Sequence, residues 1–343
     1  MAYTTINKST DYFNTKLYTG TGSSNAITGV GFAPDWVWLK RRDTSGNNYV
    51  FDTVRGATQR LITNDPASDA VDNASLTAFG SDGFTVNTET DLNANSGTFA
   101  SWNWLANGAG SANTDGSISS TVSANTTNGF SIVSYTGNGS AGATVGHGLG
   151  STPKMIIVKK RNGTASWKVY HASVGATASC PLNTNGIFDV EIYPWNNTEP
   201  TSSVFSLGTT GETNGSGANI IAYCFSDVQG FSKMGSYTGN GSTDGTFVYT
   251  GFKPSFVLIK SSSSAQSWNI LDIKRDINPN AKVLWPNDNY AEYDETQGVD
   301  FLSNGFKNNE SGAGFNGSGA SYIYMAFAEA PLVGTNNVPC TAR

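Results

Sequence analysis

The sequence is poor in charge and has no long hydrophobic run. Charged residues make up 13 % of the 343 residues, which is about half the share that is usual in soluble domains. The formal net charge of −6 argues against nucleic acid as a partner. The longest apolar runs are far too short to cross a bilayer, so we expect no membrane insertion.

Cysteine and histidine are also scarce. The three cysteines, Cys180, Cys224 and Cys340, are an odd number and do not favour a disulfide framework, although one bridge between Cys180 and Cys224 stays open. Neither His147 nor His171 has a metal-ligand spacing with Cys or Asp. We therefore expect no metal and no cofactor. The first residues are polar and lack the apolar segment of a secretion signal, so release by cell lysis fits better than export.

Glycine, serine, threonine and asparagine take the place of charge, and one short motif recurs. Tyr-Thr-Gly-Asn-Gly-Ser occurs at residues 135–140 and 237–242, and residues 18–23 differ from it at one position. The three tyrosines are about 100 residues apart, a spacing that fits tandem copies of a small domain. We take these turns as structural, because glycine supplies positive φ there and no helix follows to bind phosphate.

Strand-like segments recur in the same order after each motif. Apolar runs at residues 35–40, 154–159 and 255–260 follow a proline and end in lysine. Each run is apolar at successive positions, which predicts a central strand covered on both faces. Each copy then closes on an aromatic strand in which Trp104, Phe225 and Phe327 stand in register. With no convincing helical period, the sequence predicts an all-β protein of three jelly-roll-like β-sandwich repeats.

The predicted boundaries follow from the motif and from composition. We expect a polar lead-in at 1–16, β-sandwich repeats at 17–108, 129–228 and 229–330, and a C-terminal arm at 331–343. Residues 109–128 are nearly all small and polar, so they read as a linker, although Ile118 and Val122 could hold an extra strand. Each repeat is expected to bury its own modest core.

A group of charged residues recurs near the end of the central strand and on the next strand. It consists of Lys40, Asp52, Arg55, Lys159, Lys260, Asp272 and Arg275. We interpret the group as structural ion pairs at half-buried strand ends, because such pairs commonly hold geometry without doing chemistry. No catalytic residue is assigned.

Loop aromatics are the better candidates for function. Trp195 lies beside Asn196 and Asn197, and Trp285 lies upstream of Tyr290 and Tyr293. An exposed aromatic face stacks on the C–H groups of a sugar ring while nearby amides bind its hydroxyls. The alternative is that these rings pack against a neighbouring copy or subunit.

Several of these features together resemble a known family. These features are the opening Met1-Ala2-Tyr3-Thr4-Thr5-Ile6, the repeated Tyr-Thr-Gly-Asn-Gly-Ser, Gly-Phe-Lys-Pro before a strand, and Phe225 or Phe327 at the close of a copy. They resemble a family found in tailed phages of marine bacteria, whose members are tail-fibre-like or other virion structural proteins, many of unassigned role. The resemblance covers nearly the whole chain and brings no catalytic residues with it. It implies a virion structural protein, present in many copies per particle.

The sequence thus favours a tail fibre or appendage component that contacts other virion proteins and host-surface polysaccharide. We expect it to be made in the host cytoplasm and to act in the virion as a homo-oligomer, with a trimer favoured by analogy alone. The alternatives are a capsid decoration or head-fibre protein and, from another class, a polysaccharide depolymerase.

Overall fold

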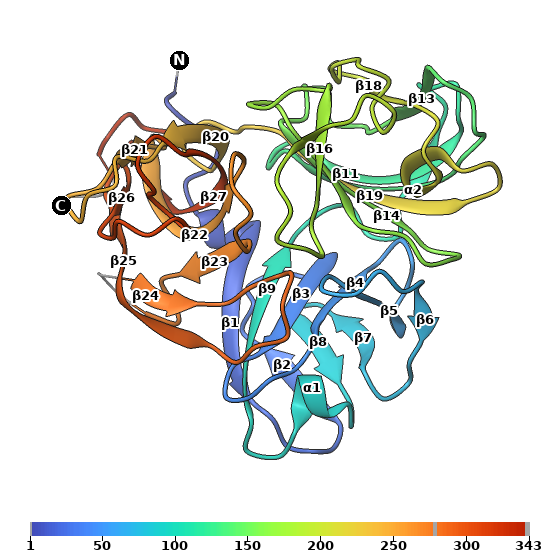
Figure 1. Ribbon diagram of the computed structural model, residues 1–343. Coiled ribbons are helices and arrows are strands. Elements are labelled where there is room, and N and C mark those ends of the chain that lie inside the picture. Colours follow the sequence, from blue (N-terminus) through green and yellow to red (C-terminus); the bar gives the residue numbers. More distant parts are fainter. Residues whose placement is uncertain (1, 277–279, 340–343) are drawn as a thin grey trace.

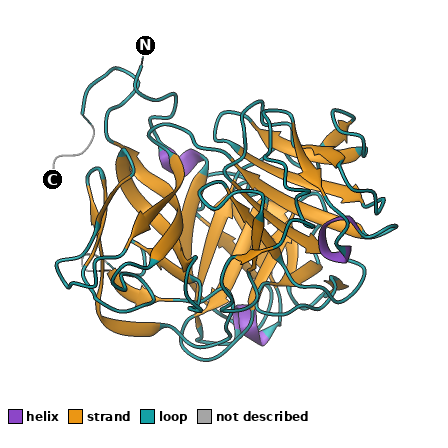
Figure 2. Cartoon of the chain, turned by 45° about the horizontal axis from the view of Figure 1, so that its top comes forward, coloured by secondary structure: helices purple, strands orange, loops and turns teal. Residues whose placement is uncertain are grey.

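The chain is all-β, as predicted, and its strands form three lobes around one centre (Figure 1). The structure is a computed structural model that describes residues 2–276 and 280–339. Figure 2 shows strands and loops throughout, with only short helical turns between them. None of the helices within the described residues is long and apolar enough to cross a membrane.

The first lobe contains a large sheet and a small one. The large sheet has the order β1 (Phe13–Thr19), β9 (Thr98–Trp104), β3 (Trp36–Arg41), β4 (Asn48–Asp52), β5 (Gln59–Ile62), β6 (Ala70–Val71). The small sheet has the order β2 (Asn25–Thr28), β8 (Gly83–Val86), β7 (Leu76–Gly80), and the short helices are η1 (Ser9–Asp11) and α1 (Thr90–Asn93).

The second lobe repeats this order within a longer sheet. Its strands run β10 (Ser111–Asn113), β11 (Ser120–Asn125), β12 (Phe130–Thr136), β19 (Asn219–Phe225), β14 (Met155–Lys160), β15 (Lys168–His171), β16 (Ala178–Pro181), β17 (Asp189–Val190). Its small sheet pairs β13 (Ala143–Gly146) with β18 (Val204–Leu207), and its helix is α2 (Gly211–Asn214).

The third lobe has two sheets of four strands. One has the order β20 (Ser232–Thr238), β27 (Ser321–Pro331), β22 (Phe252–Ser261), β23 (Asn269–Asp272). The other has the order β21 (Phe247–Tyr249), β26 (Gly305–Asn308), β25 (Tyr293–Leu302), β24 (Asn280–Val283). In all three lobes the closing strand lies between the first strand and the central strand. That the lobes are tandem repeats with jelly-roll connectivity stays a prediction.

The central strands are covered on both faces, which confirms the interpretation of their apolar runs. In β3, Val37 and Leu39 face the core of their own lobe, whereas Trp36 and Trp38 face the centre of the molecule. The strands β14 and β22 alternate in the same way. In each lobe, the sheet that contains the central strand therefore packs against the second sheet of its lobe on one face and against the other lobes on the opposite face.

The centre of the molecule is one aromatic core that all three lobes share. Trp104, Phe225 and Phe327 meet there, with ring centroids 5.7–6.4 Å apart. Phe13 stacks on Phe327 at 4.8 Å, and Trp36 stacks on Tyr223 at 4.6 Å. The expectation of three independent cores was therefore incomplete, because the largest buried cluster belongs to no single lobe.

The predicted lead-in and linker are both part of the sheets. β1 begins at Phe13 and pairs with β9, and Ile6 is buried in the shared core, so residues 1–16 are not only a polar lead-in. Within residues 109–128, β10 and β11 extend the second large sheet, and Val122 is buried in the core of that lobe. The free edge of β12 accepts this small, polar segment because its alternation suits a strand.

The repeated Tyr-Thr-Gly turns are held in the same way in each lobe. In the second lobe, Tyr135 donates its hydroxyl to the Thr213 carbonyl oxygen at 2.7 Å, and the Asn138 N–H donates to Asn214 Oδ1 at 3.0 Å. A Cβ atom at Gly137 would lie 2.5 Å from the Gly215 oxygen, and Gly139 has a φ of 73°. These glycines are therefore required by a close approach and by a left-handed conformation.

The two ends of the chain lie together at the third lobe (Figure 1). Asn7 and Thr335 exchange two hydrogen bonds, of 2.6 and 2.7 Å. The predicted arm at 331–343 starts at the end of β27, and residues 340–343, with Cys340, lie outside the described residues. Cys180 and Cys224 are buried free thiols, so no bridge joins them.

Candidate functional site

Trp195 is buried, so it is not the exposed sugar platform that the sequence suggested. The side chain is 2 % exposed and packs edge-on against Tyr170, with ring centroids 5.9 Å apart. It belongs to the core of the second lobe, because the loop after β17 turns this ring inward. For Trp195 the structure therefore supports a packing role, within the core of its own lobe.

The other three aromatic candidates are brought together on the third lobe. The ring of Trp285 lies 6.1 Å from that of Tyr290 and 6.1 Å from that of Tyr293. Tyr290 is 60 % exposed and Tyr293 is 53 % exposed, whereas Trp285 is partly buried beneath them. Together they present an aromatic surface to solvent.

A cleft of about 340 Å³ opens beside Trp285 and Tyr290. Its polar lining comes from Gln266, Ser267, Asn269, Asp288 and Glu310. The volume lies within the range in which small-molecule sites are usually found. Asp288 lies in the same loop as Trp285 and Tyr290, whereas the other four residues come from β23, the loop before it and the loop after β26, which reach the cleft only through the fold.

Hydrogen bonds fix the cleft. Trp285 donates its indole N–H to Asn269 Oδ1 at 3.0 Å, which sets the angle of the ring. Asp288 accepts from the Ser267 hydroxyl at 2.9 Å and from the Asn287 amide at 2.7 Å. The aromatic face and the carboxylate are thus held in place before any ligand arrives.

The loop that carries this site is held by the first lobe. Asn48 donates its amide to the carbonyl oxygens of Trp285 and Asp288, at 3.1 and 2.8 Å. Thr63 donates its hydroxyl to the Pro286 carbonyl oxygen at 2.8 Å. The site therefore belongs to the contact between the third lobe and the first, which closes the ring of lobes.

The aspartate and arginine candidates lie together in two buried pairs. Asp52 lies 2.5 Å from Arg55, and both side chains are fully buried. Asp272 and Arg275 form the same pair in the third lobe, at 2.6 Å. Burial lowers the pKa of the Arg55 guanidinium, whereas the Asp52 carboxylate raises it. The net result is a pKa above the usual value.

Each pair also reaches across to the next lobe. Tyr223 of the second lobe donates its hydroxyl to Asp52 at 2.7 Å. Trp102 of the first lobe donates its indole N–H to Asp272 at 3.0 Å. These carboxylates thus join lobes and face the shared core.

The three lysine candidates are not part of these pairs. Lys159 donates to the Pro66 and Ala165 carbonyl oxygens, and Lys260 donates to that of Ser261 at 2.8 Å. Lys40 donates to the Gly46 carbonyl oxygen. Burial lowers the pKa of each of these lysines to about 8. The predicted Lys–Asp–Arg group is therefore split. The lysine and the aspartate lie on neighbouring antiparallel strands, at opposite ends of the strand pair.

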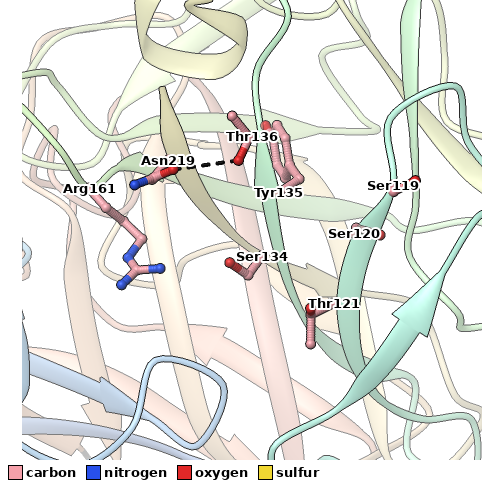
Figure 3. A pocket seen from close by; sticks show the side chains of 8 residues that line it. All are labelled: Ser119, Ser120, Thr121, Ser134, Tyr135, Thr136, Arg161 and Asn219. Atoms are coloured by element: carbon pink, nitrogen blue, oxygen red, sulfur yellow. Dashed lines mark hydrogen bonds between the residues drawn. The ribbon is translucent and has the colours of Figure 1, made fainter. Parts of the chain in front are cut away.

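A second cleft, of about 300 Å³, lies on the second lobe (Figure 3). Hydroxyls of β11 and β12 line it, together with Asn219 and Arg161. Arg161 is the only charged residue of its lining, and it pairs with Asp69 of the first lobe at 2.6 Å. The cleft is thus a polar, electrically balanced surface without an exposed aromatic ring.

Within the part of the chain that the structure describes, no group of three or more His, Cys, Asp or Glu side chains is placed to hold a metal ion. His171 donates from Nε2 to the Tyr324 carbonyl oxygen at 3.3 Å and accepts at Nδ1 from the Ser173 N–H. Nε2 therefore serves the contact between the second and third lobes, and Nδ1 serves a turn within the second lobe.

Comparison with known proteins gives a family and no activity. No curated protein and no solved structure matches the chain. One family model spans all three lobes together, from residue 8 to residue 331. The chain belongs to the family described as Domain of unknown function (DUF7483).

Proposed function

We propose that the chain is a bacteriophage virion structural protein, a component of a tail fibre or other tail appendage, which contacts host-surface glycan through the cleft at Trp285. The observation that carries the glycan contact is an aromatic surface that continues into a polar cleft. The likeness of the repeated motif to tail-fibre-like phage proteins supports the virion assignment.

The chemistry of the cleft suits a sugar ring. The rings of Trp285 and Tyr290 stand at 88° to each other, so a pyranose stacks its C–H groups on the face of one of them. Amide and carboxylate oxygens accept the hydroxyl protons of the sugar. Two carboxylates, Asp288 and Glu310, line the cleft. They disfavour acidic polysaccharides by charge repulsion and favour neutral or amino sugars.

A glycan array with the purified chain tests this function. We expect the wild type to bind a subset of neutral or amino-sugar glycans, and Tyr290→Ala to lose about fivefold to thirtyfold in affinity, as for an aromatic stacking contact worth about 1–2 kcal/mol. Tyr249→Ala is the matched control, because Tyr249 is 50 % exposed in the same lobe and does not line the cleft. Equal binding by Tyr290→Ala and the wild type would contradict the assignment of the cleft.

The two carboxylates also favour a second candidate function, a polysaccharide depolymerase. Glycoside hydrolysis uses a pair of carboxyl groups that flank the bond to be cleaved. Release of reducing sugar from a bound polysaccharide, lost in Asp288→Asn and in Glu310→Gln, would assign the enzyme. Binding without release would assign the adhesive role.

The place in the particle needs its own measurement. Immunogold labelling of virions separates a tail appendage from the capsid decoration or head-fibre alternative. Light scattering of the purified chain tests the predicted homo-oligomer, with a trimer as the expected state by analogy with phage fibres.

A further inference from the structure

The second lobe carries a small cleft beside Tyr193, two residues before the buried Trp195. The cleft measures about 190 Å³ and is lined by Tyr193, Asn196, Asn197 and Thr209, with Ile192 at its edge. Tyr193 is 60 % exposed, and Ile192 is 44 % exposed. An aromatic ring and an aliphatic side chain thus face solvent next to three polar side chains.

The buried Trp195 fixes the loop that forms this cleft. Its ring is held in the core against Tyr170, while the Pro194 carbonyl oxygen accepts from the Gly208 N–H at 3.1 Å and from the Thr213 hydroxyl at 3.1 Å. A Cβ atom at Gly208 would lie 1.7 Å from the Tyr193 oxygen. The backbone of Tyr193 is therefore pressed against β18 and its following turn, so the exposed ring stands on a rigid base.

The polar groups of the cleft are available to a ligand. The side-chain amides of Asn196 and Asn197 make no hydrogen bond within residues 2–276 and 280–339. Both residues adopt left-handed backbone conformations, with φ of 55° and 49°. Asparagine tolerates that conformation better than most residues do. Both residues thus line the cleft from a constrained turn.

We propose that this cleft is a second carbohydrate subsite, which takes a single neutral pyranose stacked on Tyr193, with its hydroxyls bound by Asn196, Asn197 and Thr209. The cleft has no charged side chain in its lining, and its 190 Å³ is smaller than the 340 Å³ beside Trp285. The smaller cleft is therefore assigned to one terminal sugar. The inference rests on the proposed function, since it makes the same protein bivalent for glycan.

Two sites on one rigid chain change how a polymer is held. A polysaccharide that reaches both clefts dissociates only when both are released at once, which increases the apparent affinity roughly a hundredfold or more over one site. Free monosaccharides gain nothing from the second site. The difference between polymer and monosaccharide binding is therefore the expected signature.

Saturation-transfer NMR tests the subsite with a panel of methyl pyranosides of glucose, galactose, mannose and N-acetylglucosamine as probes. We compare the full-length wild type with Tyr193→Ala, Tyr290→Ala, the double variant and the control Tyr249→Ala. For a glycoside that both clefts bind, we expect the wild type to transfer saturation, Tyr193→Ala and Tyr290→Ala each to transfer less, and the double variant to transfer none. Thermal melts of each variant confirm folding, which is expected because both tyrosines are exposed.

The outcomes separate the two sites. Loss of signal in Tyr290→Ala but not in Tyr193→Ala would overturn the second subsite and leave the proposed function standing. Loss in Tyr193→Ala alone would establish the second subsite and contradict the role of the Trp285 cleft. No saturation transfer to any glycoside from any folded variant would overturn the subsite. An Asn196→Ala/Asn197→Ala variant that binds like the wild type would contradict the proposed role of the amides.

Discussion

The contact between the first and second lobes and the contact between the second and third lobes have the same geometry and different chemistry. At the first contact, Asp52 pairs with Arg55 and accepts a hydrogen bond from Tyr223. At the second, His171 occupies the place of the aspartate and reaches the Tyr324 carbonyl oxygen. Val174 stands where the other lobes have arginine.

The backbone contacts at these seams are closely alike. Trp167 donates its indole N–H to the Ile62 carbonyl oxygen at 2.9 Å, and Trp268 donates in the same way to Pro181 at 3.1 Å. At the contact between the third and first lobes, the Asn48 amide takes the place of the tryptophan and donates to the Trp285 carbonyl oxygen. We infer that the arrangement of the lobes depends on sheet geometry and on the shared core. A buried charged pair at the position of Asp52 is one of several side-chain arrangements that this contact accepts.

The largest effect is expected from breaking the charged contact one partner at a time. Arg55→Val leaves the buried Asp52 carboxylate without its cation, and we expect a loss of about 3–5 kcal/mol in the free energy of unfolding. Asp52→His/Arg55→Val copies the second lobe and is expected to lose less than half as much, because no unpaired charge remains. Denaturant unfolding of the full chain measures both losses.

The arrangement of charges at the third lobe offers a matched control. Arg275→Val removes the same pair from Asp272 and also a contact of 3.2 Å with Glu292, so we expect a loss at least as large as that of Arg55→Val. If Asp52→His/Arg55→Val is as unstable as Arg55→Val, the contact needs an ion pair. The lobes are then not interchangeable at this position.

The next effect is acid sensitivity at the uncharged contact. Burial lowers the pKa of His171 to about 4 from its ordinary value of 6.5. Between these two values the unfolded chain binds a proton that the folded chain does not, so stability is full above pH 6.5 and falls as the pH falls toward 4. The total loss is about 3 kcal/mol. Unfolding at a series of pH values in this window measures the slope.

His171→Gln is the control for that slope. Burial also lowers the pKa of His147, so the variant should keep part of the acid sensitivity and lose the part due to His171. An unchanged slope in the variant would show that the contact between the second and third lobes does not respond to acid.

The smallest effect concerns a feature that the lobes share. Tyr18, Tyr135 and Tyr237 each donate a hydroxyl to a backbone carbonyl oxygen at 2.6–2.7 Å. We expect Tyr→Phe at each position to cost about 1–2 kcal/mol, since it removes one hydrogen bond and leaves one acceptor without its donor. Denaturant unfolding measures these losses. Similar losses would show that the three turns contribute equally to stability and that the lobes differ at their contacts. Unequal losses would show that the turns differ as well.

The fold class and the central strands could be predicted from local pattern. Alternation, the proline before each run and the glycine turns all act within about ten residues, so the all-β class and the two-sided burial of β3, β14 and β22 follow from the sequence. The sequence left both a linker and an extra strand open at residues 109–128, because small polar residues are typical both of flexible segments and of an added edge strand, and the structure shows the strand. Only the free edge of β12 distinguishes them.

The site could be predicted only in part. Trp285, Tyr290 and Tyr293 were identified, since aromatic residues in an Asn- and Asp-rich loop stand out. Trp195 carried the same local signal and proved to be buried, because the direction of a loop side chain depends on the sheet beneath it. The lining residues Gln266 and Glu310 come from other loops, and no local pattern brings them to the cleft.

Scanning calorimetry of the full chain is the most direct test of the shared core. If three lobes are built around Trp104, Phe225 and Phe327, the protein unfolds in one transition with equal calorimetric and van't Hoff enthalpies. Phe225→Ala should lower the temperature of that single transition as a whole. Separate transitions, with only the one for the second lobe shifted by Phe225→Ala, would contradict a common core and show three independent domains.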